Sequence, residues 1–194
     1  MMTQPLQSQL LVECADRFRT AITRAEALCA GLTPAQANFK PDPKRWSVAE
    51  CLEHLSTSMT SYLPHLQRAV ERARAAGRTG SEPWGKGTFF GRFILNNMVK
   101  GPTHMKVKAP PPFRPEVRSE WDLAEVLQRF KTRTQEMLAL LEKADGLDLG
   151  RIKQSTPMPM VKETLAQSLE IPSRHNHRHL DQAQRVTEHE SFPA

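Results

Sequence analysis

Apolar residues recur every three or four positions in four long stretches of this chain, which is the spacing of a helix with one buried face. The predicted helices cover about residues 7–30, 47–77, 120–145 and 161–187. Gly31, Gly77 and Gly146 stand where the first three of these helices would end. Glycine is favoured there because it readily adopts the left-handed backbone conformation of a helix C-cap. We therefore predict an all-α protein built on four long helices.

The second predicted helix has the clearest start. Ser47 is a favourable N-cap residue, and Glu50 follows three positions later in the pattern of a capping box. Trp46 precedes the cap, in the position of one half of a hydrophobic staple. Pro64 in this helix and Pro172 in the fourth lack a backbone N–H, so we expect a kink at each.

An irregular stretch of about residues 77–115 separates the second helix from the third. It is rich in Gly and Pro but contains a short apolar piece, residues 89–95. A loop of this length inside a domain usually has a function. We expect the piece to be a short helix that shields the end of the bundle or contacts a second subunit. The predicted fold is a four-helix bundle with a long, partly helical crossover between helices 2 and 3, in a single domain over residues 1–194 with a polar tail at about 188–194.

Cysteine use and charge narrow the class of protein. Three cysteines without a Cys-x-x-Cys motif speak against a disulfide framework and favour a cytoplasmic location. No stretch has the apolar length of a membrane span, and the N-terminus lacks the pattern of an export signal. The net charge of +6 is concentrated in residues 66–118, which hold eleven Lys and Arg against three acidic residues. This basic segment either steers anionic ligands or keeps the surface solvated.

Three histidines carry the candidate chemistry. His175 and His179 are four residues apart in the fourth helix, so their imidazoles share a face and can close on one metal ion. His54 in the second helix could supply a third imidazole and leave one coordination position open for water or substrate. The alternative is a set of core histidines bonded to backbone or carboxylate groups. The remaining histidines are expected to face solvent: His65, His104, His177 and His189.

Two motifs resemble those of the DinB-like superfamily, which includes the bacillithiol transferase-like proteins. One is Trp-Ser-x-x-Glu-x-x-x-His-Leu at residues 46–55, and the other is His-x-x-x-His-x-x-Gln at residues 175–182. The resemblance extends from the first helix to about Val186. It implies a four-helix bundle, usually a homodimer, in which His54, His175 and His179 hold one divalent metal ion, commonly zinc or nickel.

The resemblance also implies a metal-dependent reaction on a small electrophilic substrate. In an S-transferase the metal holds a low-molecular-weight thiol as the thiolate, which is the nucleophile. In a hydrolase it acidifies a bound water instead. We expect the first, with Gln182 orienting a ligand or a metal-bound water. The alternative is a non-catalytic metal-binding module of a stress response.

Neighbouring residues have lesser expected roles. Glu50 or Glu53 could accept a hydrogen bond from a ligand histidine, although we expect both at the surface. Cys51 lies one turn before His54 and is expected to be a buried, inert thiol. Four crossover residues are expected to attract an anionic thiol or substrate: Lys86, Arg92, Lys106 and Lys108. The basic segment has no recognised nucleic-acid motif and no interleaved aromatic residues, so no nucleic-acid partner is expected.

Overall fold

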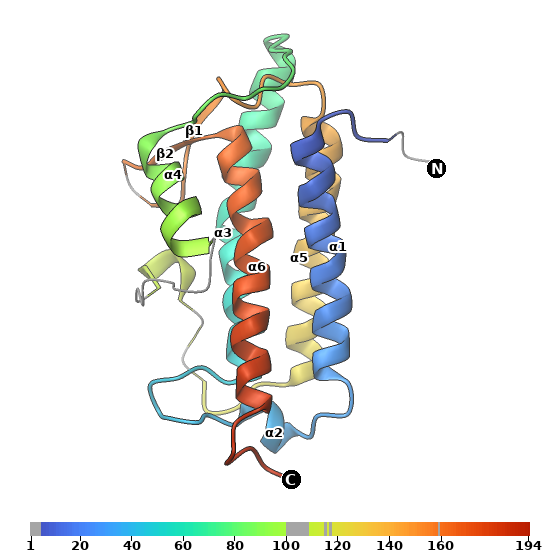
Figure 1. The fold of residues 1–194 in the computed structure, drawn as a ribbon, viewed down its shortest axis with the longest axis vertical. Coiled ribbons are helices and arrows are strands. Elements are labelled where there is room, and N and C mark those ends of the chain that lie inside the picture. The colour runs from blue at the N-terminus through green and yellow to red at the C-terminus, as the bar shows by residue number, and fades with distance from the viewer. Residues whose placement is uncertain (1–4, 100–108, 115, 117, 159) are drawn as a thin grey trace.

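Four long helices lie side by side in the computed structural model, which describes residues 5–99, 109–114, 116, 118–158 and 160–194 (Figure 1). They are α1 (Gln9–Cys29), α3 (Val48–Ala75), α5 (Leu123–Ala144) and α6 (Leu165–Thr187). The prediction of an all-α bundle is confirmed. No helix in the described part of the chain is long and apolar enough to cross a bilayer.

The helix ends follow the local sequence signals. Ser47 caps α3, and the predicted capping box is present because the Glu50 carboxylate accepts from the Ser47 backbone N–H at 2.9 Å. Gly31 and Gly146 have φ angles of +78° and +80°, which only glycine adopts without strain. Both α3 and α6 continue as helices through Pro64 and Pro172.

The predicted start of the fourth helix at residue 161 was wrong. Residues Lys162–Thr164 form strand β2, which pairs antiparallel with β1 (Lys153–Ser155), and α6 begins only at Leu165. The helix starts there because Thr164 is the N-cap of a second capping box, closed by the Gln167 side chain three residues later. A five-residue helix, α2 (Pro34–Asn38), was also missed.

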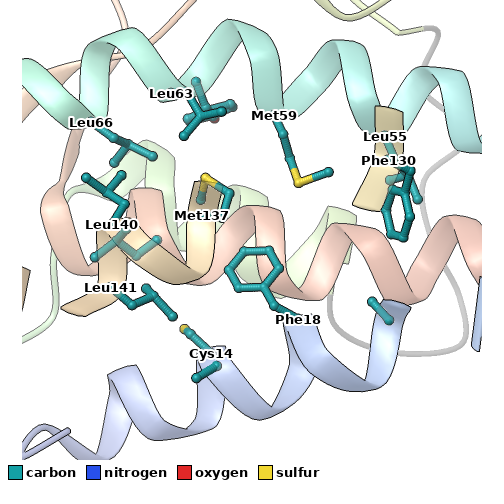
Figure 2. Close-up of a cluster of buried hydrophobic side chains, with 14 of the residues drawn as sticks. Cys14, Phe18, Leu55, Met59, Leu63, Leu66, Phe130, Met137, Leu140 and Leu141 are labelled. Carbon is teal, nitrogen blue, oxygen red and sulfur yellow. The ribbon is translucent and has the colours of Figure 1, made fainter. Parts of the chain in front are cut away.

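The core lies between the long helices. Figure 2 shows Phe18 of α1, Met59 of α3, and Phe130 and Met137 of α5 pointing toward one another, and each is at most 1% exposed. The thiol of Cys14 lies in the same cluster, where burial raises its pKa to about 11 and so keeps it protonated. This packing fixes the position of α3 relative to α1 and α5.

The crossover between α3 and α5 is partly helical, as predicted. It contains α4 (Phe89–Ile94), the π-helical turn η1 (Leu95–Val99) and the 3-10 turn η2 (Pro111–Phe113). The helix α4, green in Figure 1, lies along the flank of α6. It does not cross the end of the bundle, so the expectation that it shields that end was wrong. Gln167 of α6 holds it there, since its amide accepts from the Thr88 backbone N–H at 2.9 Å and donates to the Thr88 carbonyl at 3.1 Å.

Candidate metal centre

The structure brings His54 of α3 together with His175 and His179 of α6. One ring nitrogen from each lies within 4.8 Å of those of the other two. The Nε2 atoms of His54 and His175 are 3.3 Å apart, and the three ring centroids are 4.5 to 5.0 Å from one another. Three imidazoles at these separations can close on one metal ion with a small adjustment of their side chains, since zinc–nitrogen bonds are about 2 Å long.

Two of the rings are oriented by hydrogen bonds at Nδ1. The Nδ1 atom of His54 lies 2.5 Å from the carbonyl oxygen of Phe113, and that of His179 lies 3.0 Å from the amide oxygen of Gln182. Both oxygens can only accept, so each Nδ1 carries the proton and each Nε2 keeps a free lone pair. This is the tautomer that a metal-binding histidine needs.

The alternative of ordinary core histidines fits less well. Phe113 and Gln182 occupy only the Nδ1 atoms of His54 and His179, Nε2 of His54 lies 3.3 Å from Nε2 of His175, and no carboxylate in the described part of the chain bonds to any of the three rings. A hydrogen bond between the rings of His54 and His175 would satisfy only that pair of nitrogens, whereas one metal ion would bind a nitrogen of all three rings.

Burial keeps the three imidazoles neutral. Desolvation lowers the pKa of His54 to about 4. It also lowers the pKa values of His175 and His179 well below 6.5, and the neighbouring imidazoles lower them further because charging one ring would repel the next. At neutral pH no proton must therefore leave before a metal ion binds.

Trp46 covers one side of the centre. Its ring centroid is 4.5 Å from that of His54 and 5.5 Å from that of His179. The sequence analysis assigned Trp46 only to one half of a hydrophobic staple at the helix start. Its contact with the histidines was missed. An aromatic wall excludes water from this side, which strengthens electrostatic interactions at the centre.

A cleft of about 1640 Å³ opens beside the histidines. Ser58, one turn after His54, and Asn176, next to His175, both line it. The Ser58 hydroxyl and the Asn176 side-chain oxygen are buried and have no hydrogen-bond partner among the described residues. Buried polar atoms normally have a partner, so these two atoms mark a place in the cleft wall where the described residues leave hydrogen-bonding capacity unused.

The two glutamates proposed as partners of the histidines are engaged elsewhere. Glu53 is buried rather than exposed, and its carboxylate accepts from Arg129 of α5 at 2.9 Å. Glu50 is half-buried and is shared between the Ser47 backbone and Lys40. Cys51 is completely buried, and burial raises its pKa far above the usual range, as expected of an inert thiol.

The expectation that the other histidines face solvent was wrong for His177. It is half-buried between α6 and α1, where its ring nitrogens lie 2.9 Å from the Arg17 carbonyl and 3.1 Å from the Arg24 guanidinium. His65 and His189 are also half-buried, and His104 lies outside the described residues.

The predicted basic residues do not line the cleft where the structure describes them. Lys86 and Arg92 lie on another part of the surface, where the Arg92 guanidinium donates to the Lys86 carbonyl at 3.3 Å. Lys106 and Lys108 lie outside the described residues. The cations that do line the cleft come mainly from the segment before α3 and from the second half of α6.

Comparison with known proteins agrees with this architecture. The family model of the DinB superfamily matches residues 17–183, which include all three histidines and most of the bundle. Searches of curated proteins and of solved structures found no match to the chain. Because the family model covers well over half of its length, the chain belongs to the DinB superfamily.

Proposed function

We propose that this protein is a metal-dependent enzyme that binds one divalent ion through His54, His175 and His179. The observation that carries the proposal is the convergence of three neutral imidazoles, two of which carry the proton on Nδ1 and therefore have a lone pair on Nε2. Imidazole ligands suit zinc and nickel, and the resemblance described above favours these two metals.

Three protein ligands leave a coordination position for the reaction. When bound, the ion would hold a thiol as thiolate or lower the pKa of a water. The cleft gives a small molecule access to this position, and Trp46 forms part of its wall against the rings of His54 and His179. The Gln182 amide oxygen holds His179 in the binding orientation. Ser58 and Asn176 offer hydrogen bonds to a polar group of the substrate.

We propose transfer of a low-molecular-weight thiol to a small electrophile as the first reaction to test, with hydrolysis as the second. The proposal of a thiol rests on the resemblance of the two motifs. A protein thiol is a poor alternative nucleophile, because Cys14, Cys29 and Cys51 are all buried and burial raises the pKa of each. The proposal of a homodimer is independent of this choice and is tested by the mass of the protein in solution.

A non-catalytic metal-binding module is the second candidate. It is favoured by the surroundings of the histidines, since no carboxylate among the described residues bonds to them and could act as a general base there. Turnover distinguishes the two candidates. A metal-loaded protein that converts neither thiol plus electrophile nor an ester would support the module.

Metal content of the untagged protein tests the centre itself. Elemental analysis after loading with zinc or nickel should give about one ion per chain, and His179→Ala should lose it. His177→Ala is the matched control, because His177 lies two residues away on the same helix but bonds to α1. Loss of metal in both variants, or in neither, would overturn the assignment of His179.

A further inference from the structure

The residues that line the cleft change from apolar to cationic along α6, and this change indicates the chemistry of the ligand. Ile171 and Pro172 line it at one end, His175 and His179 in the middle, and Arg185 at the other end. At 1.5 Å per residue, Ile171 and Arg185 are separated by about 21 Å along the helix axis. A ligand bound at the histidines therefore has an apolar region on one side and a cationic region on the other.

The apolar region is built from the crossover and the start of α6. Phe90 and Phe93 of α4, Ile94, and Met98 of η1 line it together with Ile171. Phe90 and Phe93 are 36% and 37% exposed, although they face a concave surface. Large aromatic side chains left open on a concave surface mark a binding site for an apolar group.

The cationic region surrounds the opposite end of the cleft. Lys40, Lys44 and Arg45 precede α3, Arg114 follows η2, and Arg185 lies near the end of α6; the acidic lining residues among those described are Asp42, Glu50 and Glu116. Arg178 also lines the cleft, but its guanidinium donates to the Met98 carbonyl beside the apolar region. Among the described residues of this region, five cations against three acids leave a net charge of +2. Glu50 pairs with Lys40, and Glu116 pairs with Arg118 outside the lining. Arg45 and Arg185 form no ion pair within the described part of the chain, so both can receive an anionic group.

We propose that the ligand of this cleft is a small anionic amphiphile. Its apolar body would lie against α4, its anionic group would lie near Arg45 and Arg185, and its reactive centre would lie between them, beside the histidines. The position of the reactive centre rests on the proposed metal-dependent function, whereas the placement of the two ends rests on the lining of the cleft alone. A carboxylate with an extended apolar chain is the simplest molecule with this pattern.

Binding of probes with a ten-carbon chain, and of one short-chain carboxylate, tests the two ends separately. Calorimetric titrations would compare decanoate with decanol, decyltrimethylammonium and butyrate, on metal-free and on zinc-loaded protein. We expect decanoate to bind best to both forms, because the apolar region would contact its chain and the arginines would contact its carboxylate. Equal binding of decanoate and decyltrimethylammonium would overturn the role of the cations, and equal binding of decanoate and butyrate would overturn the role of the apolar region.

Matched variants assign each end to its residues. Phe90→Ser with Phe93→Ser should weaken decanoate binding about tenfold or more. Phe89→Ser should not, because Phe89 is 78% exposed and lies outside the lining.

Arg45→Glu with Arg185→Glu should weaken the binding of decanoate about tenfold and leave the binding of decanol unchanged. The control for this charge change is Arg19→Glu with Arg68→Glu, outside the cleft. A control that weakens binding as much as its partner variant would overturn the assignment.

The two proposals fail in different ways. Zinc that binds at one ion per chain without any preference for decanoate would leave the metal centre standing and reject the anionic amphiphile. Decanoate that binds with the expected preference to a protein unable to hold zinc or nickel would reject the metalloenzyme. Only the proposed placement of the ligand's two ends would then remain supported.

Discussion

The Nδ1–H of His54 donates to the carbonyl oxygen of Phe113, a residue 59 positions away at the far end of the crossover. The Phe113 ring in turn stacks on Tyr62 of α3, with centroids 5.8 Å apart and an interplanar angle of 15°. The orientation of one candidate metal ligand therefore depends on how the crossover packs back onto α3.

Phe113→Ala tests this dependence. Removing the ring leaves the backbone carbonyl in the chain but removes the stacking that holds it in place. We expect the affinity for zinc to fall about tenfold, as it does when the hydrogen-bond partner of a metal-bound histidine is disturbed. Competition with a chromogenic chelator measures the affinity, and Phe89→Ala serves as an exposed control on α4. Unchanged affinity in Phe113→Ala would mean that the carbonyl position does not depend on the ring.

Gln182→Ala should weaken zinc binding for a related reason. The variant removes the oxygen that accepts from His179 Nδ1 at 3.0 Å, so the ring loses its fixed tautomer and orientation. We expect a loss of about ten- to a hundredfold in affinity. Gln182→Glu keeps an acceptor at the same position and should restore most of it. If Gln182→Glu is as weak as Gln182→Ala, the hydrogen bond is not the cause.

The long helices and the histidine triad could be predicted because their signals are local and periodic. Apolar stripes and the Ser47–Glu50 capping box located α3 to within about one residue at its start, since both signals depend only on helix geometry. The i, i+4 spacing of His175 and His179 fixes their common face in the same way. His54 was already the candidate third ligand from its position on the second helix, and the resemblance supported it, although periodicity does not say which helices pack together.

What the sequence did not predict depends on tertiary contacts or on very short elements. The carbonyl of Phe113 is a backbone group, and no residue type indicates which histidine it will reach. Trp46 contacts two histidines only because α3 and α6 pack side by side. The strands β1 and β2 have three residues each, too few to show an alternating pattern, although the Thr164–Gln167 capping box was a readable signal for the true start of α6.

Glu163→Gln should stabilise the protein at alkaline pH. Glu163 is fully buried on β2, and burial raises its pKa from 4.5 to about 7, although the hydroxyls of Ser168 and Tyr62 donate to it. The folded state therefore binds the proton more tightly than the unfolded chain. Stability is greatest below pH 4.5, falls as pH rises to about 7, and stays lower above that pH.

The amide of Glu163→Gln keeps an acceptor for Ser168 and never ionises. We expect the variant to be more stable than the wild type by about 1–3 kcal/mol at pH 8 and nearly equal to it at pH 4.5. Urea unfolding at the two pH values measures this difference. A variant that is less stable at both pH values would show that the carboxylate is stabilised in its charged form.

The three histidines should give the metal-free protein the opposite pH dependence. Their pKa values are lowered in the folded state, to about 4 for His54, so below pH 6.5 the unfolded chain binds more protons than the folded one. Stability is fully present above pH 6.5 and falls as pH drops toward 4, by up to about 1.4 kcal/mol per pH unit for each histidine.

Urea unfolding in the Glu163→Gln background isolates the contribution of the histidines. His175→Gln with His179→Gln removes two of the three groups and should reduce the slope between pH 6.5 and 4.5 clearly. An unchanged slope would mean that these rings are not buried in neutral form.

Gly91→Ala tests how α4 is held against α6. A methyl group at Gly91 would overlap Cδ of Gln167, whose side chain cannot easily move because it bonds to the Thr88 backbone and to the Thr164 N–H. Alanine favours a helix over glycine by about 0.8–1 kcal/mol. We nevertheless expect Gly91→Ala to destabilise the protein by about 1–3 kcal/mol, since displacing Gln167 also breaks the capping box of α6.

A double-mutant cycle separates the two effects of the Gly91 substitution. In a Gln167→Ala background the three atoms nearest to the methyl group are gone, so Gly91→Ala should become neutral or stabilising there. Urea unfolding of the four proteins gives the coupling free energy. The same penalty in both backgrounds would mean that the cost arises within α4 itself. A penalty confined to the wild-type background would show that the close approach of Gly91 to Gln167 positions the helix that carries Phe90 and Phe93.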